Sequence, residues 1–408
     1  MIYGLIGRTL KHSMSVPIHR ALGNGLYRLY ELEPDEIGAF VRDERLGGIN
    51  VTIPYKRDVL KFCDVISPEA AAIGSANTVV RRGGELYAYN TDFFGFSYML
   101  DRAGIDVSKK KVLILGSGGT SLTAKAVCAA RNAAETITVS RSGKDNYENL
   151  TKHRDASIII NTTPVGMYPA AGVSPVDIGV FPKLEGVVDV IYNPLTTKLL
   201  YDAETAGIKH TGGLPMLVAQ GVAADGIFFD REAGYDRVEP ILASLYEDMR
   251  NTVLIGMPGC GKSTVGKLIA QKTGKRFIDT DDEICAETGR DPAEILKTDG
   301  EAVFRSIEAD AVKISGAATG AVIACGGGVV TREENYYPLH SNGVICFIDA
   351  PPEELITDGR PLSLSRGVNE LYRERLPAYR RFADVTVKRL QTPRETAEAI
   401  MEALNDVR

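Results

Sequence analysis

The 408-residue sequence has no tryptophan, few histidines, few cysteines and no excess of positive charge. Its six cysteines are scattered with no two at metal-ligand spacing, which disfavours a disulfide framework and is typical of a reducing compartment. Basic residues number 47 against 53 acidic ones, a net charge of −6, so nucleic acid and anionic membranes are not expected partners. No apolar run approaches the ~18 residues of a membrane span, and Gly7, Arg8 and Lys11 interrupt the first one before a signal sequence could form. We therefore expect a cytoplasmic protein.

What the sequence does contain is enough material for several domains. At ~150 residues per domain, the length predicts two to three units, and 44% hydrophobic with 25% charged residues is an ordinary globular composition. Short β-branched runs alternate with longer segments of helical period, the pattern of a parallel sheet covered by helices. We therefore expect an α/β protein. An amphipathic segment over 238–250 predicts a helix, with a domain boundary just after it, near Asn251.

The segment KVLILGSGGTS at 111–121 predicts a first nucleotide site. Gly116, Gly118 and Gly119 stand where a strand would turn into a helix and let the backbone approach a pyrophosphate. On its own this pattern is weak, because Ser121 replaces the usual third small residue and such turns also occur without a ligand. The next predicted strand, TITVSRS, ends in Ser140, Arg141 and Ser142 rather than in an acidic residue. A guanidinium, with Lys144 nearby, suits a 2′-phosphate, so NADP is favoured over NAD, the alternative being a merely solvated Arg141.

Polar clusters in the first 95 residues predict a site for a small polyhydroxy acid. They include hydroxyl and amide side chains together with Lys56 and Asp92. If those two residues meet in a desolvated cleft, they form a proton-transfer pair that protonates an oxyanion as hydride arrives. The alternatives are a surface lysine and an aspartate that caps a helix beginning at Phe93.

The segment TVLIGMPGCGKST at 252–264 contains a complete G-x-x-x-x-G-K-[ST] pattern between a predicted strand and a predicted helix. Its backbone amides would cradle phosphates, Lys262 would reach the β and γ groups, and Ser263 would offer a hydroxyl to Mg²⁺. Cys260 is either a small loop-filling residue or a thiolate of low pKa. The predicted ATP-binding residues are Gly259, Cys260, Gly261, Lys262, Ser263, Thr264 and Arg360.

The next predicted strand, RFID, is followed by more carboxylates. Asp279 is placed to hold the Mg²⁺ shell and Asp281 to orient an acceptor hydroxyl, unless these residues only cap a helix starting near Asp282. Further on, Arg305, Arg360 and Arg380 suit phosphate transfer and carboxylate capture.

The first half resembles the shikimate dehydrogenases. The segments YGLIGRTLKHSMS, GGINVTIPYK, GSANTV, NTDFFGF, GSGGTS, NTTPVGM, VVDVIYNP and GGLPMLVAQG stand in that family's order over about residues 3–221. The resemblance implies that Lys56 and Asp92 are the catalytic residues. It implies a substrate site made of Ser13, Ser15, Asn50, Thr52, Lys56, Asn77, Asp92, Tyr192 and Gln220, with the two serines on the substrate carboxylate. It implies an NADP site made of Gly116, Ser117, Gly118, Gly119, Thr120, Ser140, Arg141, Ser142, Gly213 and Met216, the last two bordering the nicotinamide.

The second half resembles shikimate kinase over about residues 252–400, through GMPGCGKST, DTD, DGEAVFR, GGG, RPL and PAYR in that order. The resemblance implies a shikimate site made of Asp281, Arg305, Gly326, Gly327, Gly328 and Arg380. It also implies that Lys262 and Arg360 neutralise the transferring phosphoryl group, and that Ser263 and Asp279 hold Mg²⁺. The segment EELITDGRPL lacks the arginine that packs on adenine in this family.

Together these observations predict a bifunctional enzyme that reduces 3-dehydroshikimate with NADPH and phosphorylates the resulting shikimate with MgATP. The expected layout is a substrate-binding lobe over 1–95, completed by 230–250, a Rossmann-like NADP lobe over 96–229 and a P-loop kinase domain over 251–408. A homo-oligomer is compatible with the sequence. Two alternatives stay open: a dehydrogenase active on quinate fused to a kinase, and an active dehydrogenase with a nucleotide-binding C-terminal module that does not turn over.

Overall fold

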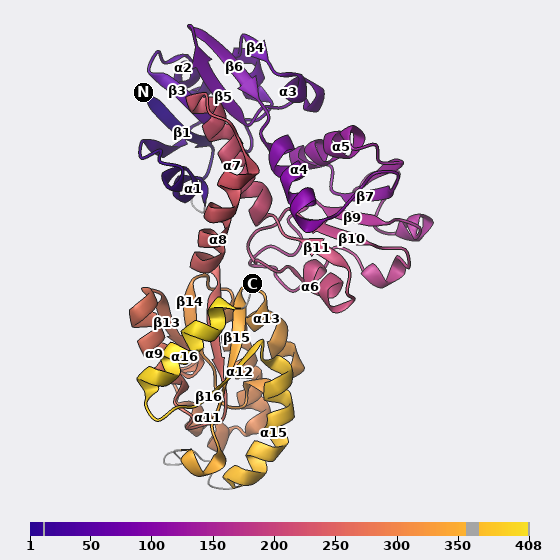
Figure 1. Ribbon diagram of the computed structural model, residues 1–408. Coiled ribbons are helices and arrows are strands. Elements are labelled where there is room, and N and C mark those ends of the chain that lie inside the picture. Colours follow the sequence, from indigo (N-terminus) through magenta and orange to yellow (C-terminus); the bar gives the residue numbers. More distant parts are fainter. Residues whose placement is uncertain (11–12, 356–366, 407–408) are drawn as a thin grey trace. The chain divides into compact units, whose positions relative to one another are not determined.

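The computed structural model describes residues 1–10, 13–355 and 367–406, and it divides into two compact units (Figure 1). The first unit comprises 1–167, 173–192 and 199–244, and the second comprises 168–172, 193–198 and 245–408. Each unit is described by itself below. The α/β class expected from the alternating pattern is confirmed. Within the described ranges, none of the helices combines the length and apolarity needed to cross a membrane.

The first unit contains a mixed sheet of six strands in the order β2-β1-β3-β5-β6-β4. The strands are β1 (Ile2–Gly7), β2 (Tyr27–Glu31), β3 (Leu46–Val51), β4 (Val65–Ile66), β5 (Thr78–Arg82) and β6 (Glu85–Tyr89). Strand β3 is buried along its whole length, and it pairs antiparallel with β5 so that Asn50 lies opposite Thr78. Around this sheet lie α1 (Ser15–Ala21), α2 (Ile37–Arg42), α3 (Pro68–Ile73) and the short helix η1 (Asp58–Phe62).

The second sheet of this unit is parallel, with five strands in the order β11-β10-β9-β7-β8. They are β7 (Lys111–Leu115), β8 (Glu135–Val139), β9 (Ile158–Asn161), β10 (Gly186–Asp189) and β11 (Lys209–Thr211). The chain runs from β7 to β8 on one side and then returns to β9 on the other side of β7, so the strand order reverses there. Ligands of such sheets bind at this reversal, beyond the carboxyl ends of the strands.

Helices α4 (Asp92–Ala103) and α7 (Leu214–Phe229) pack closely against each other in the first unit (Figure 1). A Cβ atom at Gly95 of α4 would lie 2.5 Å from the carbonyl oxygen of Met216 in α7, so this approach requires glycine. The remaining helices that belong to this unit in whole or in part are α5 (Gly119–Ala130), α6 (Lys198–Thr205) and α8 (Val238–Met249), with η2 (Leu150–His153), η3 (Ile178–Val180) and η4 (Tyr235–Arg237). Helix α8 ends within one residue of the helix predicted over 238–250.

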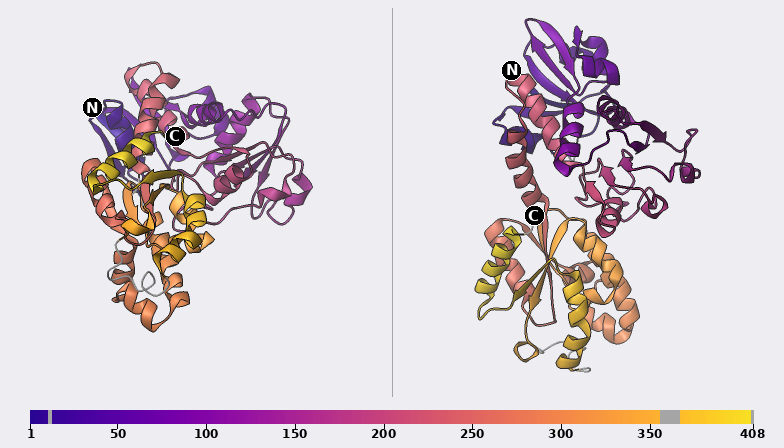
Figure 2. Two further views of the ribbon diagram at one scale, coloured as in Figure 1. Left: turned by 60° about the horizontal axis from the view of Figure 1, so that its bottom comes forward. Right: turned by 45° about the vertical axis from the view of Figure 1, so that its right-hand side comes forward.

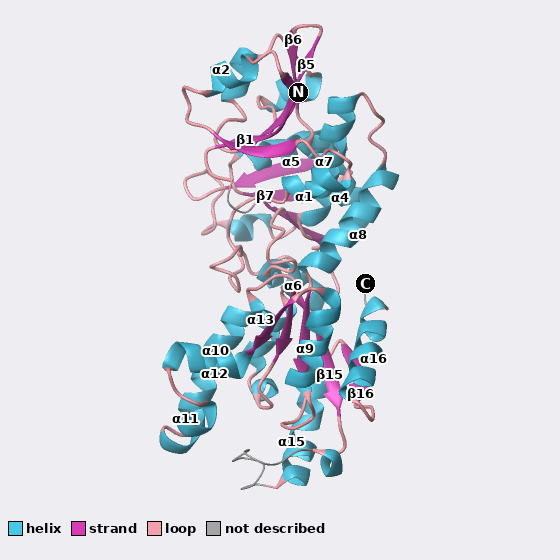
Figure 3. Ribbon diagram, turned by 90° about the vertical axis from the view of Figure 1, so that its left-hand side faces the viewer, coloured by secondary structure: helices cyan, strands magenta, loops and turns pink. Residues whose placement is uncertain are grey.

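The second unit has a parallel sheet of five strands in the order β13-β14-β12-β15-β16. They are β12 (Asn251–Ile255), β13 (Arg276–Asp279), β14 (Ala321–Ala324), β15 (Gly343–Asp349) and β16 (Val385–Lys388). Helices α9 (Lys262–Thr273) and α16 (Pro393–Asn405) pack side by side against this sheet (Figures 2 and 3). The others are α10 (Thr280–Thr288), α11 (Pro292–Thr298), α12 (Glu301–Gly316), α13 (Tyr336–His340) and α15 (Val368–Phe382), with η5 (Val329–Thr331), η6 (Glu333–Asn335) and η7 (Pro352–Glu354).

Two short segments from the earlier part of the sequence belong to this second unit. In 193–198, the backbone N–H of Leu195 donates to Asn342 Oδ1 at 2.8 Å, and that of Thr196 donates to the Ser341 carbonyl at 2.8 Å. In 168–172, the Tyr168 hydroxyl lies 3.1 Å from Ser341 Oγ. The division of the chain therefore does not follow the sequence order alone.

Candidate active sites

Lys56 and Asp92 meet in the first unit. Lys56 follows β3, Asp92 is the first residue of α4, and Lys56 Nζ lies 2.6 Å from Asp92 Oδ2. The Asp92 side chain is only 12% exposed and that of Lys56 is 25% exposed, so this pair is shielded well beyond an ordinary surface ion pair. Asp92 does not cap α4, because the N-cap residue is Thr91 and no side chain caps this end of the helix.

Asn77 holds the other oxygen of the Asp92 carboxylate. Its Oδ1 accepts from the backbone N–H of Thr91 at 2.7 Å, which sets the orientation of the amide, and its Nδ2 donates to Asp92 Oδ1 at 2.9 Å. Both carboxylate oxygens of Asp92 therefore receive a hydrogen bond, one of them from an ammonium group. Such a pair can hold a hydroxyl or an oxyanion and exchange a proton with it.

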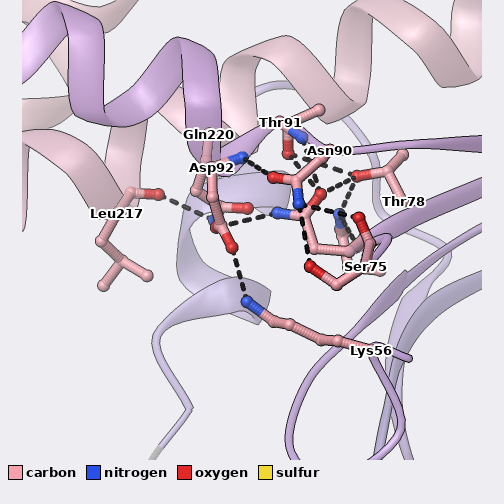
Figure 4. Close-up of polar contacts among 10 residues, drawn as sticks. Lys56, Ser75, Thr78, Asn90, Thr91, Asp92, Leu217 and Gln220 are labelled. Carbon is pink, nitrogen blue, oxygen red and sulfur yellow. Dashed lines mark hydrogen bonds and ion pairs between the residues drawn. The ribbon is translucent and has the colours of Figure 1, made fainter. Parts of the chain in front are cut away.

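The other predicted substrate residues are distributed around this pair. Gln220 projects from α7 beside Asp92, and its Nε2 donates to the Leu217 carbonyl at 2.9 Å (Figure 4). Ser15 is buried at the start of α1, and its backbone N–H donates to Ser13 Oγ at 3.2 Å. Thr52 and Tyr192 are half-buried, and burial raises the pKa of the Tyr192 hydroxyl. Asn50 is buried on β3, and its side-chain amide makes four hydrogen bonds, with His19, Tyr27, the Asn77 carbonyl and Thr78.

The glycine-rich turn after β7 has the geometry of a phosphate cradle. Gly116 has φ of +103°, and α5 begins at Gly119 with Gly118 as N-cap and without a side chain that caps it. A Cβ atom at Gly118 or Gly119 would meet nothing within 4 Å, so the space over this helix N-terminus is open to a ligand. Ser117 is exposed and Thr120 half-buried on the same turn. These residues fit the pyrophosphate of a dinucleotide.

The segment after β8 lies next to this turn. Strands β7 and β8 pair in register up to Leu115 and Val139, and the Gly116 N–H donates to the Val139 carbonyl at 2.8 Å. Ser140, Arg141 and Ser142 follow directly, and the last two are exposed. Gly213 is the N-cap of α7, where a Cβ would lie 2.0 Å from the Val190 carbonyl oxygen, and Met216 is buried one turn later.

In the second unit the loop after β12 has the expected P-loop form. Helix α9 begins at Lys262, after Gly261 with φ of +99°, and Lys262 Nζ donates to the carbonyls of Gly256 and Met257 at 2.8 and 3.1 Å. Ser263 Oγ lies 2.6 Å from Asp279 Oδ2, so the two predicted Mg²⁺ ligands are adjacent. Asp279 is also the N-cap of α10, where its Oδ1 accepts from the Asp281 N–H at 3.1 Å.

The residues around this loop complete a nucleotide site. Gly259 has φ of +89°, and Cys260 is buried with its Sγ 3.9 Å from Lys262 Nζ. A cleft of about 480 Å³ extends from the loop and is lined by Ser263, Thr264, Lys267, Leu268, Gln271, Thr392, Pro393 and Arg394. Arg360 lies outside the described residues, as does the segment that lacks the family's adenine-packing arginine.

Asp281, Arg305 and Glu308 converge on the glycines after β14. A Cβ at Gly326 would lie 2.7 Å from Glu308 Oε1 and 3.2 Å from Asp281 Oδ1, and one at Gly328 would lie 2.0 Å from Arg305 Nη1. Asp281 is exposed to solvent, but the protein atoms packed around its carboxyl, followed by the like charge of Asp279, raise its pKa to about 6 against the opposing effect of Lys262. Among the described residues, Glu308 Oε1 and Arg305 Nε are buried without a hydrogen-bond partner. Buried polar atoms of this kind point to a polar ligand.

The structure places Arg375, which the sequence analysis did not single out, where Arg380 was expected. Arg375 is 3% exposed, its Nη1 donates to the Gly327 carbonyl at 3.0 Å, and the Tyr379 hydroxyl donates to the same oxygen. Arg380 is exposed, and it lies about 100° further around α15 than Tyr379, outside the face that carries Arg375 and Tyr379. The available signal was the spacing of Arg375 and Tyr379, which puts both on the buried face of α15.

The fold and these sites define a protein that joins a dinucleotide-binding oxidoreductase to a P-loop kinase. Residues 5–79 match the model of the shikimate dehydrogenase substrate binding domain, and residues 258–405 match that of shikimate kinase. The chain is 35% identical over 246 residues to the NADP(+)-dependent shikimate dehydrogenase of Clostridium beijerinckii, covering 55% of this chain and 91% of that protein. The chain thus belongs to the shikimate dehydrogenase family and carries a shikimate kinase domain in addition, which confirms both expected resemblances.

Solved structures agree with this assignment for the first half. A chorismate mutase/shikimate 5-dehydrogenase fusion protein from Clostridium acetobutylicum has a TM-score of 0.57 and 35% identity, covering 60% of this chain and 96% of that one. Shikimate 5-dehydrogenase from Thermus thermophilus, in complex with NADP(H) and shikimate, has a TM-score of 0.54 and 28% identity, covering 60% of this chain and 99% of that one.

Proposed function

We propose that this chain catalyses two steps of the shikimate pathway, the NADPH-dependent reduction of 3-dehydroshikimate and the MgATP-dependent phosphorylation of shikimate at its 3-hydroxyl. The observation that carries the first activity is the shielded contact between Lys56 and Asp92. The second activity is supported by the adjacency of the P-loop hydroxyl of Ser263 to Asp279 and by the convergence of Asp281 and Arg305 beside it.

In the dehydrogenase, Lys56 and Asp92 manage the proton at the oxygen that is reduced. The C3 oxygen gains negative charge as hydride adds to C3, and the Lys56 ammonium stabilises and protonates it. Asp92 holds Lys56 beside the substrate oxygen, Asn77 holds Asp92 in place, and Lys56 takes up a proton from solvent after the step. Ser13 and Ser15 bind the substrate carboxylate at the start of α1, and Gln220 reaches the ring from α7.

NADP(H) fits the turn after β7 because that turn leaves open space over a helix N-terminus. When bound, NADPH supplies the hydride. The residues that hold it are those of the glycine-rich turn, while Arg141 with Ser140 and Ser142 hold the 2′-phosphate, and Gly213 and Met216 border the nicotinamide.

In the kinase, catalysis consists mainly of positioning and charge neutralisation. Asp281 orients the attacking hydroxyl, and Arg305 with Arg375 binds the shikimate carboxylate near Gly326, Gly327 and Gly328. Lys262 and Arg360 neutralise the phosphoryl group, and the backbone amides of the P-loop hold the other phosphates. Ser263 and Asp279 fit Mg²⁺ because an alcohol and a carboxylate oxygen are ligands that this ion prefers, and the ion screens charge on the phosphates when bound. The nucleoside of ATP would occupy the cleft beside Thr264 and Pro393.

Separate assays of each half test this proposal. We expect shikimate oxidation with NADP⁺ to be much faster than quinate oxidation with NAD⁺, and we expect phosphate transfer from ATP to shikimate to disappear in Lys262→Met while the dehydrogenase rate stays unchanged. A preference for quinate with NAD⁺ would contradict the substrate assignment. Absence of phosphate transfer from the intact chain would leave the C-terminal part as a binding module.

A further inference from the structure

A buried polar network stands behind the Lys56–Asp92 pair, and the proposed function leaves most of it without a role. It runs from His19 and Tyr27 through Asn50 and Thr78 to Asn77. Thr78 is completely buried, so it cannot touch a substrate.

Within this network Asn50 uses its full hydrogen-bonding capacity. Its Nδ2 faces the Asn77 carbonyl at 3.3 Å, an oxygen that only accepts, and donates its other hydrogen to Thr78 Oγ1 at 3.0 Å. Its Oδ1 accepts from the Tyr27 hydroxyl at 2.7 Å and from His19 Nε2 at 3.1 Å. A side-chain amide has two donors and two acceptor lone pairs, and all four are used at 5% exposure. Asn50 therefore has nothing left to offer a substrate hydroxyl unless one of these bonds breaks.

His19 contributes a fixed donor to this arrangement. Burial lowers the pKa of His19 to about 4, so the ring is neutral at pH 7 and has one N–H. Because Asn50 Oδ1 can only accept, that hydrogen is on Nε2. The His19 ring also stacks on Tyr27, with ring centroids 3.8 Å apart. At the end of the network away from Asp92, the Asn50 amide oxygen therefore accepts hydrogen bonds from two side chains whose rings stack on each other.

Thr78 connects this fixed amide to the catalytic pair. The pairing of β3 with β5 puts Thr78 opposite Asn50, and its hydroxyl donates to Asn77 Oδ1 at 3.1 Å and contacts Thr91 Oγ1 at 3.2 Å. Asn77 in turn donates to Asp92. The bonds of the two amides have a set direction, because a backbone group of fixed type orients each amide. Between the Thr78 and Thr91 hydroxyls either can donate, and the Thr91 hydroxyl also lies 3.1 Å from Asn77 Oδ1.

We propose that Thr78 is a positioning residue of the dehydrogenase, and that Asn50 acts through it on Asn77 and Asp92 rather than by contacting the substrate. This inference rests on the proposed dehydrogenase function. It predicts that damage to the network lowers kcat, because Asp92 and Lys56 lose their alignment, while the groups that bind the substrate stay in place.

The test compares Thr78→Val with Thr78→Ser in the full chain, with shikimate and NADP⁺ as substrates. We expect Thr78→Val to lower kcat about tenfold, with KM for shikimate within twofold of the unchanged chain. Thr78→Ser keeps the hydroxyl and should restore kcat to within twofold. The matched control is Thr136→Val on β8 in the other sheet of this unit, and kinase activity of each preparation reports on the rest of the chain.

A second variant tests the Tyr27 end of the network, and it also tests the proposal if Thr78→Val does not fold. Tyr27→Phe removes one donor to Asn50 and also the interaction of that hydroxyl with Ser15, so only its kcat is compared, and kcat should fall about threefold. Combined with Thr78→Val, where that variant folds, it should add little, because both act on one path. An unchanged kcat in both variants, or a raised KM at constant kcat in Thr78→Val, would overturn the proposal. Absence of shikimate oxidation by the unchanged chain would instead overturn the proposed dehydrogenase function.

Discussion

Two aspartates illustrate how the same side chain takes different roles in the two halves. Asp92 receives a hydrogen bond on each carboxylate oxygen, from Lys56 and Asn77, and its role is to hold a cation. Asp281 stands among other carboxylates at the proposed shikimate site, and its pKa is raised to about 6. The residue type alone does not set the role, because the neighbouring donors and charges decide it.

The Lys56–Asp92 pair yields the first prediction. Asp92→Asn leaves Lys56 without its anionic partner, and Lys56→Met removes the group that protonates the oxyanion. Each should lower the dehydrogenase kcat by a factor of about 10² to 10⁴. Steady-state assays with shikimate and NADP⁺ measure this, and unchanged kinase activity of the same preparations is the control. A loss below fivefold in both variants would contradict a catalytic role.

The pKa of Asp281 yields a prediction about pH. A protonated Asp281 carboxyl cannot accept the proton of the attacking hydroxyl, so kcat/KM of the kinase for shikimate should fall at acidic pH. Mg²⁺ bound at Asp279 offsets one of the charges that raise this pKa, so the fall should lie below about pH 6. The Asp281→Asn variant should have much lower kinase activity, and a plot of its kcat/KM against pH should lack the fall at acidic pH.

The same shift has a consequence for stability. Because the folded-state pKa of Asp281 exceeds its ordinary value of 3.8, the folded state holds the proton more tightly, and stability is lost as pH rises from about 4 through about 6. Asp281→Asn should therefore raise the unfolding temperature at pH 8 relative to the unchanged chain. A decrease at pH 8 would mean that the ionised carboxylate stabilises the fold instead.

Arg375 and Arg380 give a direct comparison between structure and sequence. Arg375→Lys should raise the kinase KM for shikimate at least tenfold, because an ammonium cannot replace the paired donors of a guanidinium. Arg380→Lys should change it less than twofold. The reverse pattern would restore the role expected for Arg380 from the sequence.

At the scale of elements, the sequence predicts most of what positions the sites. The helix over 238–250, the strands before both glycine-rich turns and the P-loop helix follow from local patterns, because apolar period and glycine placement are properties of short segments. The side of α15 that faces Gly327 depends on packing against another segment. The contact of Lys56 with Asp92 joins residues 36 positions apart, and local pattern contains no information on it.

The segment after β8 is the element that should choose the cofactor. Arg141→Ser removes the exposed guanidinium next to the phosphate turn and should raise KM for NADPH about tenfold while leaving KM for NADH nearly unchanged. Arg154→Ser is the matched control, because Arg154 is also exposed and precedes β9 of the same sheet. Equal effects on both cofactors would mean that Arg141 supports the fold rather than the 2′-phosphate.

At the scale of the whole molecule, the chain has no excess of positive charge. With a net charge of −6, the electrostatic field of the whole chain does not attract anionic substrates. We therefore expect local groups to bind these substrates, such as Arg305, Arg375 and the helix N-termini at the two glycine-rich turns. The presence of both enzyme families in one chain has a simple chemical meaning, because the proposed product of the first reaction is the proposed substrate of the second.

The most direct test of that account is one assay on one preparation, with 3-dehydroshikimate, NADPH and MgATP supplied together. The account predicts NADPH consumption and formation of shikimate 3-phosphate, with phosphate transfer dependent on NADPH and abolished in Lys262→Met. Consumption of NADPH without any phosphorylated product, also when shikimate itself is added, would contradict the bifunctional assignment.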